Sequence, residues 1–208
     1  CYILVNKSNM KKIISITIIF LFFGFSNLSK SDDLNRAYLA LEKKDYKTAI
    51  YFLSYYANLG NAKAQYNYAI MLKNGLGTKK DPNEAFKWLF LSADQGNMLA
   101  NYAIGQSYFK GKGVKKNYKL ALESFKKAAL MGHASSKINL GSIYYFGHGI
   151  NKNYPKAYLW WKLALDQNAN GAVENLHTLK KIIDSKDLSK GVSLYNKCLK
   201  MLLMECLK

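Results

Sequence analysis

Residues 61–96 read NAKAQYNYAIMLKNGLGTKKDPNEAFKWLFLSADQG, and the chain returns to this pattern at intervals of 36 residues. Four sets of residues recur in step, which chance does not readily produce. The sets are two loop glycines (Gly75, Gly111, Gly147 and Gly77, Gly113, Gly149), an alanine (Ala49, Ala85, Ala121, Ala157) and a terminal residue (Gly60, Gly96, Gly132, Asn168). The interval defines three full units, residues 61–96, 97–132 and 133–168.

Each unit predicts two helices joined by a glycine loop. Residues 62–73 carry apolar side chains on one face, as an amphipathic first helix does. A Gly-x-Gly loop then ends the helix through conformations with positive φ. Asp81 is the expected N-cap of the second helix, with Pro82 at its first position and Glu84 completing a capping box. We therefore predict an all-α fold, an α-solenoid of helix-turn-helix repeats.

Irregular units flank the three repeats, which together take up residues 61–170. Residues 32–60 keep the second-helix pattern but lack the Gly-x-Gly loop, so we predict a degenerate first repeat there. Residues 171–208 are predicted to form C-terminal capping helices at 172–183 and 188–207, because a solenoid exposes an apolar face at each end. The terminal helix carries an apolar stripe that could instead face a partner; it is formed by Leu194, Cys198, Met201 and Leu202.

Residues 1–26 have the pattern of a cleavable signal peptide, with two lysines ahead of the apolar run at residues 13–25. The run is shorter than the roughly 20 residues of a membrane-spanning helix. Gly24 and Ser26 are the small residues that a signal peptidase requires, so we expect cleavage after Ser26, with Met10 as the start. The mature chain would then be periplasmic or secreted, and an uncleaved N-terminal anchor would be its only membrane contact.

The chain is strongly basic, with 31 Lys plus Arg against 13 Asp plus Glu and a net charge of +18. Only Arg36 is an arginine, and scattered lysines lack the planar, bidentate recognition of phosphate that arginine supplies. No specific nucleic-acid site is therefore expected. Lysines recur ahead of each second helix, and stacking would align them into a ridge for an acidic partner or an anionic glycan; they are Lys43, Lys44, Lys79, Lys80, Lys115, Lys116 and Lys152.

The cysteines do not form a disulfide framework. On one continuous helix, Cys198 and Cys206 would lie about 12 Å apart, too far to bridge. We expect free thiols packed among apolar residues, with an intermolecular disulfide as the alternative.

Nothing in the sequence assembles a catalytic site, so we expect no enzyme activity, metal or cofactor. The histidines are not at metal-ligand spacing, and we expect His133 and His148 on surface loops. Ser107 and Ser124 each begin a Ser-x-x-Lys match but lack the companion motifs of a penicillin-recognising enzyme. A protein that binds or hydrolyses peptidoglycan or β-lactams in the envelope stays open as the alternative function.

The pattern resembles the Sel-one-like repeat, a 36-residue relative of the tetratricopeptide repeat, over residues 61–170. The residues that carry the resemblance are Ala64, Ala69, Leu72, Gly75, Leu76, Gly77, Asp81, Ala85, Trp88, Ala93 and Gly96. It implies a right-handed α-solenoid that acts as an adaptor in bacterial envelope, signalling or host-contact assemblies. The chain lacks the cysteine pairs that staple each repeat in cysteine-rich exported members.

We therefore expect an exported scaffold of the bacterial envelope or host-contact type, which binds another protein or peptide in a groove lined by the first helices. Tyrosine and asparagine are frequent on these helices and suit recognition. Tyr66, Tyr102 and Tyr144 recur at core-type positions and are expected to pack. The candidate contact residues are Asn67, Tyr68, Lys73, Asn101, Lys137 and Tyr145.

Overall fold

The structure is a computed structural model that describes residues 33–201 and residue 205. The expected signal peptide at residues 1–26 lies outside this part. The described regular elements are a helical segment at residues 33–42 and helices α2 (Tyr46–Asn58), α3 (Ala62–Asn74), α4 (Pro82–Asp94), α5 (Met98–Lys110), α6 (Tyr118–Leu130), α7 (Ala134–Phe146), α8 (Tyr154–Leu165), α9 (Ala172–Lys180) and α10 (Ser185–Lys200). Over the described ranges, no helix is long and apolar enough to span a membrane.

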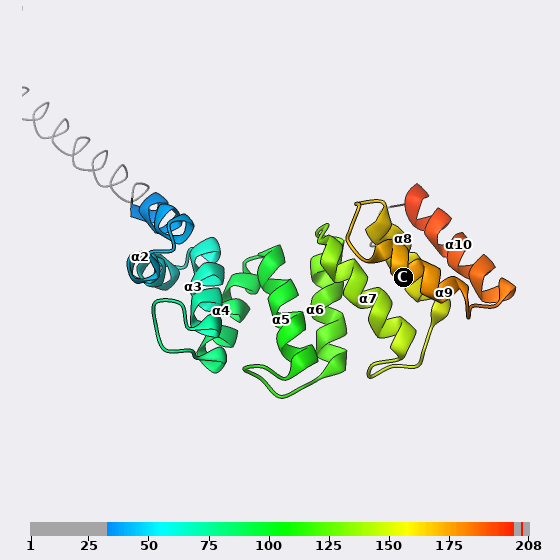
Figure 1. The fold of residues 1–208 in the computed structure, drawn as a ribbon, viewed down its shortest axis with the longest axis horizontal. Coiled ribbons are helices and arrows are strands. Elements are labelled where there is room, and N and C mark those ends of the chain that lie inside the picture. The colour runs from blue at the N-terminus through cyan, green and yellow to red at the C-terminus, as the bar shows by residue number, and fades with distance from the viewer. Residues whose placement is uncertain (1–32, 202–204, 206–208) are drawn as a thin grey trace, which may run out of the picture.

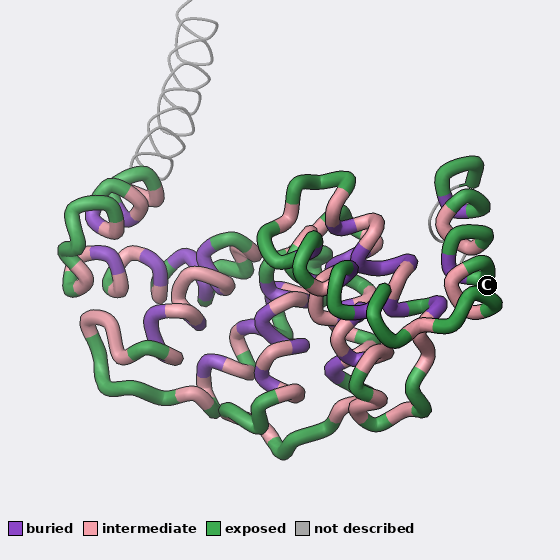
Figure 2. The backbone as a smooth tube through the Cα atoms, turned by 45° about the vertical axis from the view of Figure 1, so that its right-hand side comes forward, coloured by how far each residue is buried: buried purple, intermediate pink, exposed green. Residues whose placement is uncertain are grey.

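The helices stack as consecutive pairs. Helix α3 packs on α4, α5 on α6 and α7 on α8, and each pair also packs on the next. Figure 1 shows the pairs following one another in a row from α2 to α8, with the long loops along one edge. In Figure 2, buried positions follow the helix surfaces that face one another, and exposed positions follow the loops. The predicted all-α solenoid is confirmed.

Apart from α9, which follows Gly171, the labelled helices begin at polar N-caps, as expected. Asp81 Oδ1 accepts hydrogen bonds from the backbone N–H groups of Asn83 (3.0 Å) and Glu84 (2.9 Å). The predicted capping box is nevertheless half formed, because Asp81 N–H donates to the Leu72 carbonyl (2.8 Å) and Glu84 pairs with Lys87 (2.9 Å). The same backward bond joins Asn117 to Tyr108 (2.9 Å) and Asn153 to Tyr144 (2.8 Å). Each cap residue therefore also ties its helix to the end of the preceding one.

The second glycine of each Gly-x-Gly loop lies against the start of the preceding repeat's second helix. Gly113 has a φ of +77°, and a Cβ on it would overlap the backbone carbonyl of Pro82. The equivalent contacts join Gly77 to Tyr46 and Gly149 to Tyr118. The loop thus brings successive units into close contact, and a side chain would be disfavoured both by φ and by space.

Within each repeat, the middle of the first helix is matched in size to the second helix. Gly105 lies against the Phe125 ring, and Gly141 lies against the Trp161 ring, which a Cβ would overlap in both cases. At the equivalent position of the preceding unit, Ala69 shares a buried cluster with Leu89. The small residue therefore makes room for a large one 20 residues later, and the aromatic partners occur where the small residue is glycine.

The N-terminal unit consists of the segment at residues 33–42 and α2. Its turn replaces the Gly-x-Gly loop with a much shorter connection, in which Lys44 has a φ of +59°. Ala37 and Ala40 of the segment pack with Ala49 and Leu53 of α2. The unit is therefore a helix pair with a shortened loop.

The C-terminal helix departs from its prediction. Helix α10 ends at Lys200, and Met201 is extended (φ −127°, ψ 162°), so a continuous helix over 188–207 is wrong at its end. Cys198 is disulfide-bonded, and the expectation of free thiols is therefore wrong for it. The other two cysteines of the chain lie outside the described residues. Leu194 and Cys198 pack on Leu159 of α8, so this part of the apolar stripe covers the last repeat.

Candidate partner-binding groove

Two of the six candidate contact residues are buried inside repeats. The exposed fractions of Asn101 and Lys137 are 7% each. Lys137 Nζ donates to Gln167 Oε1 (2.8 Å), and the equivalent residue Gln65 accepts from Gln95 Nε2 (2.8 Å). Asn101 Nδ2 donates to the backbone carbonyl of Asn97, the N-cap of its own helix (3.0 Å). At this repeat position the side chain makes a hydrogen bond inside its own repeat. We therefore do not retain Asn101 or Lys137 as a partner contact.

The two candidate tyrosines pack on tryptophans of the second helices. The Tyr68 and Trp88 rings are in a T-shaped arrangement with centroids 5.4 Å apart. The ring centroid of Tyr145 lies 5.4 Å from that of Trp161 and 5.8 Å from that of Tyr154. Both tyrosines are half-buried, so each has a packing role and a remaining exposed surface.

Asn67 is also half-buried, and its Nδ2 donates to the Lys63 carbonyl of its own helix (3.0 Å). The tyrosines expected in the core, including Tyr66 and Tyr144, do pack, and burial raises the pKa of both phenols.

Asn101 borders a space of about 280 Å³ between α4, α5 and α6, and Lys73 lines a larger pocket. The pocket has a volume of about 400 Å³ and lies where the end of α3 meets α5 and the next glycine loop. Lys73 comes from α3, Gln106 and Lys110 from α5, and Lys80 and Lys112 from the loops. Burial, and then the nearby Lys110 and Lys112, lower the pKa of Lys73. The site therefore concentrates positive charge around a half-buried ammonium group.

A second pocket adjoins the first along α5. It has a volume of about 130 Å³ and is lined by Phe109 and Phe125 together with Asn139 and Ser142 of α7. Gln106 and Lys110 line both pockets. We refer to the two pockets together as the α3–α7 groove. It offers a basic end and an end that combines aromatic rings with amide and hydroxyl groups.

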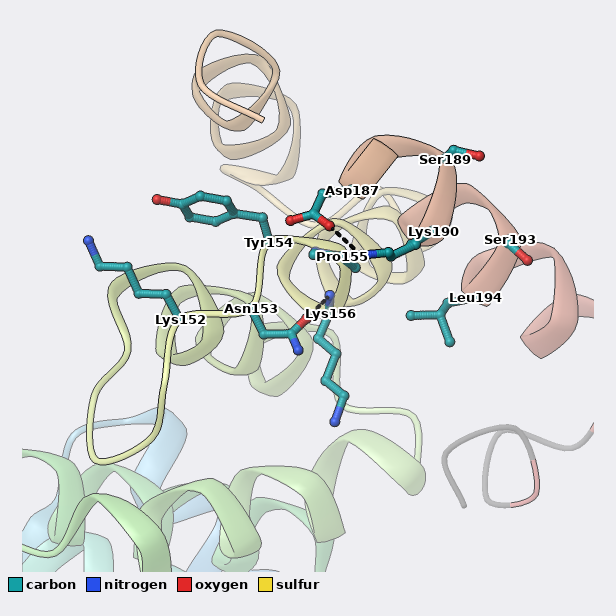
Figure 3. Close-up of a pocket in the computed structure, with 10 residues that line it drawn as sticks. All are labelled: Lys152, Asn153, Tyr154, Pro155, Lys156, Asp187, Ser189, Lys190, Ser193 and Leu194. Carbon is teal, nitrogen blue, oxygen red and sulfur yellow. Dashed lines mark hydrogen bonds and ion pairs between the residues drawn. The ribbon is translucent and has the colours of Figure 1, made fainter. Parts of the chain in front are cut away.

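A larger pocket of about 900 Å³ lies between the start of α8 and α10 (Figure 3). Two of its three lysines have partners: Lys190 pairs with Asp187 (2.8 Å), and Lys156 lies over the Tyr144 ring (5.4 Å). Figure 3 shows the Lys152 side chain directed away from Lys190. The lining of this pocket includes the acidic Asp187, whereas the pocket at Lys73 is lined by four lysines and no acidic residue.

The loops that carry the predicted lysine ridge lie on one side of the molecule. Figure 1 shows the loops at residues 75–81, 111–117 and 147–153 along the same edge. Their ridge lysines are exposed. The ridge meets the groove at Lys80, which lines the basic pocket.

His133, His148 and the serines of the two Ser-x-x-Lys matches make contacts within the fold. Both histidines lie in loops, as expected, but both are half-buried. His133 is the N-cap of α7, and the ring centroid of His148 lies 5.1 Å from that of Tyr118 and 5.3 Å from that of Phe109. Ser107 is buried, and Ser124 Oγ donates to the Leu120 carbonyl (2.8 Å). In the described part of the chain, no group of three or more His, Cys, Asp or Glu residues could hold a metal ion.

Sequence reasoning missed Gln106, Lys110, Lys112 and Ser142 as lining residues. A usable signal was the repeat register, which puts lysine or asparagine at the last positions of α3 and α5 beside the glycine loop. These residues come close to Lys73 because the loop of the next repeat folds back toward α3. The pattern of a single repeat does not contain this information.

Comparison with known proteins identifies the repeat. The model of the Sel1 repeat matches residues 34–61, 62–97, 99–133 and 134–168. A Sel1 repeat protein from Oxalobacter formigenes is 30% identical, with a TM-score of 0.63 over 67% of this chain and 57% of that one. A protective antigen present in uropathogenic Escherichia coli strains, which displays an SLR fold, is 26% identical, with a TM-score of 0.75 over 85% of this chain and 39% of that one.

The chain thus spans little more than half of the first of these proteins and less than half of the second. No curated protein matches it. The four matched stretches take up most of the chain and include its short first unit, and the chain therefore belongs to the Sel1 repeat family.

Proposed function

We propose that this chain is an exported scaffold that holds a partner protein or peptide in the α3–α7 groove. Sel1 repeat proteins are generally scaffolds for protein–protein interaction. The observation that carries the proposal is the pair of adjoining pockets, which present lysine, amide and hydroxyl groups beside Phe109 and Phe125. Polar groups next to apolar rings are what a protein partner requires for both specificity and affinity.

Two features support export to an oxidising compartment. The apolar run at residues 13–25 follows a pair of lysines, as in a signal peptide. Cys198 is disulfide-bonded, and structural disulfides persist mainly outside the reducing cytosol.

Site-specific photo-crosslinking tests the groove. A photoreactive residue at Gln106 or Asn139 should capture one and the same protein from the native envelope, identified by mass spectrometry. Matched probes at the exposed Lys119 and at Lys126 of α6, outside the groove, should not capture it. Equal capture at all four positions would contradict a groove partner.

The N-terminal residue of the mature protein tests export. Cleavage after Ser26 gives Asn27 as the first residue, and fractionation should place this product outside the cytoplasm. A cytoplasmic product that retains residues 1–26 would contradict export without affecting the groove assignment.

A further inference from the structure

The basic pocket of the α3–α7 groove lacks any acidic lining residue. Its four lysines are Lys73, Lys80, Lys110 and Lys112, and the other lining groups are neutral. None of the ion pairs between described residues involves these lysines. An unpaired cluster of like charges in a concave site opposes folding and favours the binding of an anion.

The energetic cost of the unpaired positive charges is clearest at Lys73. Its side chain is half-buried at the end of α3, and burial together with Lys110 and Lys112 lowers its pKa. A carboxylate bound in the pocket would offset both causes of the lowered pKa. It would pair with the half-buried ammonium group of Lys73, and it would counter the repulsion from Lys110 and Lys112.

The repeat itself does not require this pocket. The residues around it are Lys73, Pro82, Lys110 and Lys112, and 36 residues later the same positions hold Phe109, Tyr118, Phe146 and His148. There aromatic rings contact one another in place of the lysines, and the ring centroids are 5.3 Å apart for Phe109 and Tyr118, 5.1 Å for Tyr118 and His148, and 5.5 Å for Phe146 and His148.

The junction one repeat earlier is also filled by apolar side chains. There Tyr46 and Leu76 occupy the positions of Pro82 and Lys112, and both pack on a buried core cluster. Of these three equivalent junctions, the one between α3 and α5 carries lysines at three of the four positions.

We propose that this pocket binds acidic side chains of an extended Asp/Glu-rich peptide, whose next apolar side chain enters the adjoining pocket against Phe109 and Phe125. The inference rests on the groove proposed above as the partner site and names the chemistry of its ligand. Lys73 and Lys110 pair with the carboxylates, and Gln106, Asn139 and Ser142 offer hydrogen bonds to the peptide backbone. The shared lining residues Gln106 and Lys110 make the two pockets continuous for such a peptide.

The test uses a fluorescein-labelled peptide of four glutamates followed by leucine, and its analogue with glutamine in place of glutamate. Fluorescence anisotropy should show that the glutamate peptide binds at physiological salt and the glutamine analogue does not. Combined Lys73→Gln and Lys110→Gln replacement should weaken binding at least tenfold, because it removes two of the four lysines that converge on the carboxylates, including the half-buried Lys73. The matched control is Lys119→Gln with Lys126→Gln, which removes the same charge from α6 and should change affinity less than twofold.

A second variant fills the pocket with the residues of the next junction: Lys73→Phe, Lys110→Phe and Lys112→His. It should abolish peptide binding while circular dichroism shows an unchanged helix content. Equal weakening by the pocket and control variants, binding of the glutamine analogue, or no binding of the glutamate peptide would overturn the proposal. If Asn139 still crosslinks its partner in any of these cases, the groove stands and only the acidic ligand is wrong.

Discussion

Equivalent residues cap the first helices of the three full repeats, but one of them can change its charge near neutral pH. Asn61, Asn97 and His133 each accept a hydrogen bond from the start of the helix that follows. His133 Nδ1 accepts from the Ser136 backbone N–H (3.2 Å), and its ring centroid lies 4.3 Å from that of Tyr102. Burial lowers the pKa of His133, so the fold favours the neutral ring that can accept this bond.

We predict that this cap makes stability depend on pH. Because the folded pKa lies below the unfolded value of about 6.5, the unfolded chain binds the proton more tightly, and stability is lost as pH falls below that value. His133→Asn should supply the cap without titrating and remove about 1 kcal/mol of this loss. Urea denaturation at pH 7 and pH 5 measures it, and parallel pH profiles for the two proteins would contradict the role of His133.

Single residues also limit how far the site could be predicted. Lys73 and the register around it were readable from the sequence. The roles of Asn101 and Lys137 were not, because the environment of this position is set 30 residues later: Lys137 meets Gln167, whereas Asn101 has Met131 at the equivalent place and bonds within its own helix. Contact residues on a solenoid face depend on such pairings between helices.

At the scale of helices, the predictable features were those encoded locally. Asp81, Asn117 and Asn153 cap their helices as expected, and Asn168 takes the left-handed conformation (φ +53°) of the glycines it replaces. The end of α10 was not predictable by periodicity, since apolar spacing continues past Lys200 although the helix stops there. Local turn and cap chemistry therefore predicts helix bounds better than periodicity does near a chain end.

The size match between the two helices of a repeat gives an element-scale prediction. Gly141→Ala should destabilise the protein by about 1–3 kcal/mol, because its Cβ would overlap the Trp161 ring. Combining it with Trp161→Leu recreates the Ala69–Leu89 pair of the first full repeat. The double variant should be at least about 1 kcal/mol more stable than the sum of the single effects implies.

Urea denaturation of the parent, both single variants and the double variant measures this coupling. The matched control combines Gly141→Ala with Leu53→Ala, which lies in α2 and outside the clusters around α7 and α8, and should be additive. Additivity of the Gly141 and Trp161 variants would show that the two side chains do not share space.

At the scale of the whole molecule, packing runs between neighbouring units, and the two ends are built differently. Helix α10 covers α8 at Leu159, which is buried, whereas Tyr51 at the equivalent position of α2 is 71% exposed. Among the residues that the structure describes, each end therefore has its own core, joined to the other through the repeats between them. Such a molecule is expected to loosen locally rather than everywhere at once.

We predict that Leu159→Ala and Leu53→Ala, each costing about 2–5 kcal/mol by opening a cavity, will act at opposite ends of the chain. Both leucines are fully buried, Leu159 beneath α10 and Leu53 between α2 and the segment at residues 33–42. Hydrogen exchange followed by mass spectrometry should show faster exchange in α8 and α10 for the first variant, with α2 and α3 unchanged. The second variant should show the reverse pattern, since each repeat contacts only its neighbours and the loss decays along the stack. Uniform acceleration along the whole chain by either variant would mean that the units unfold as one cooperative body.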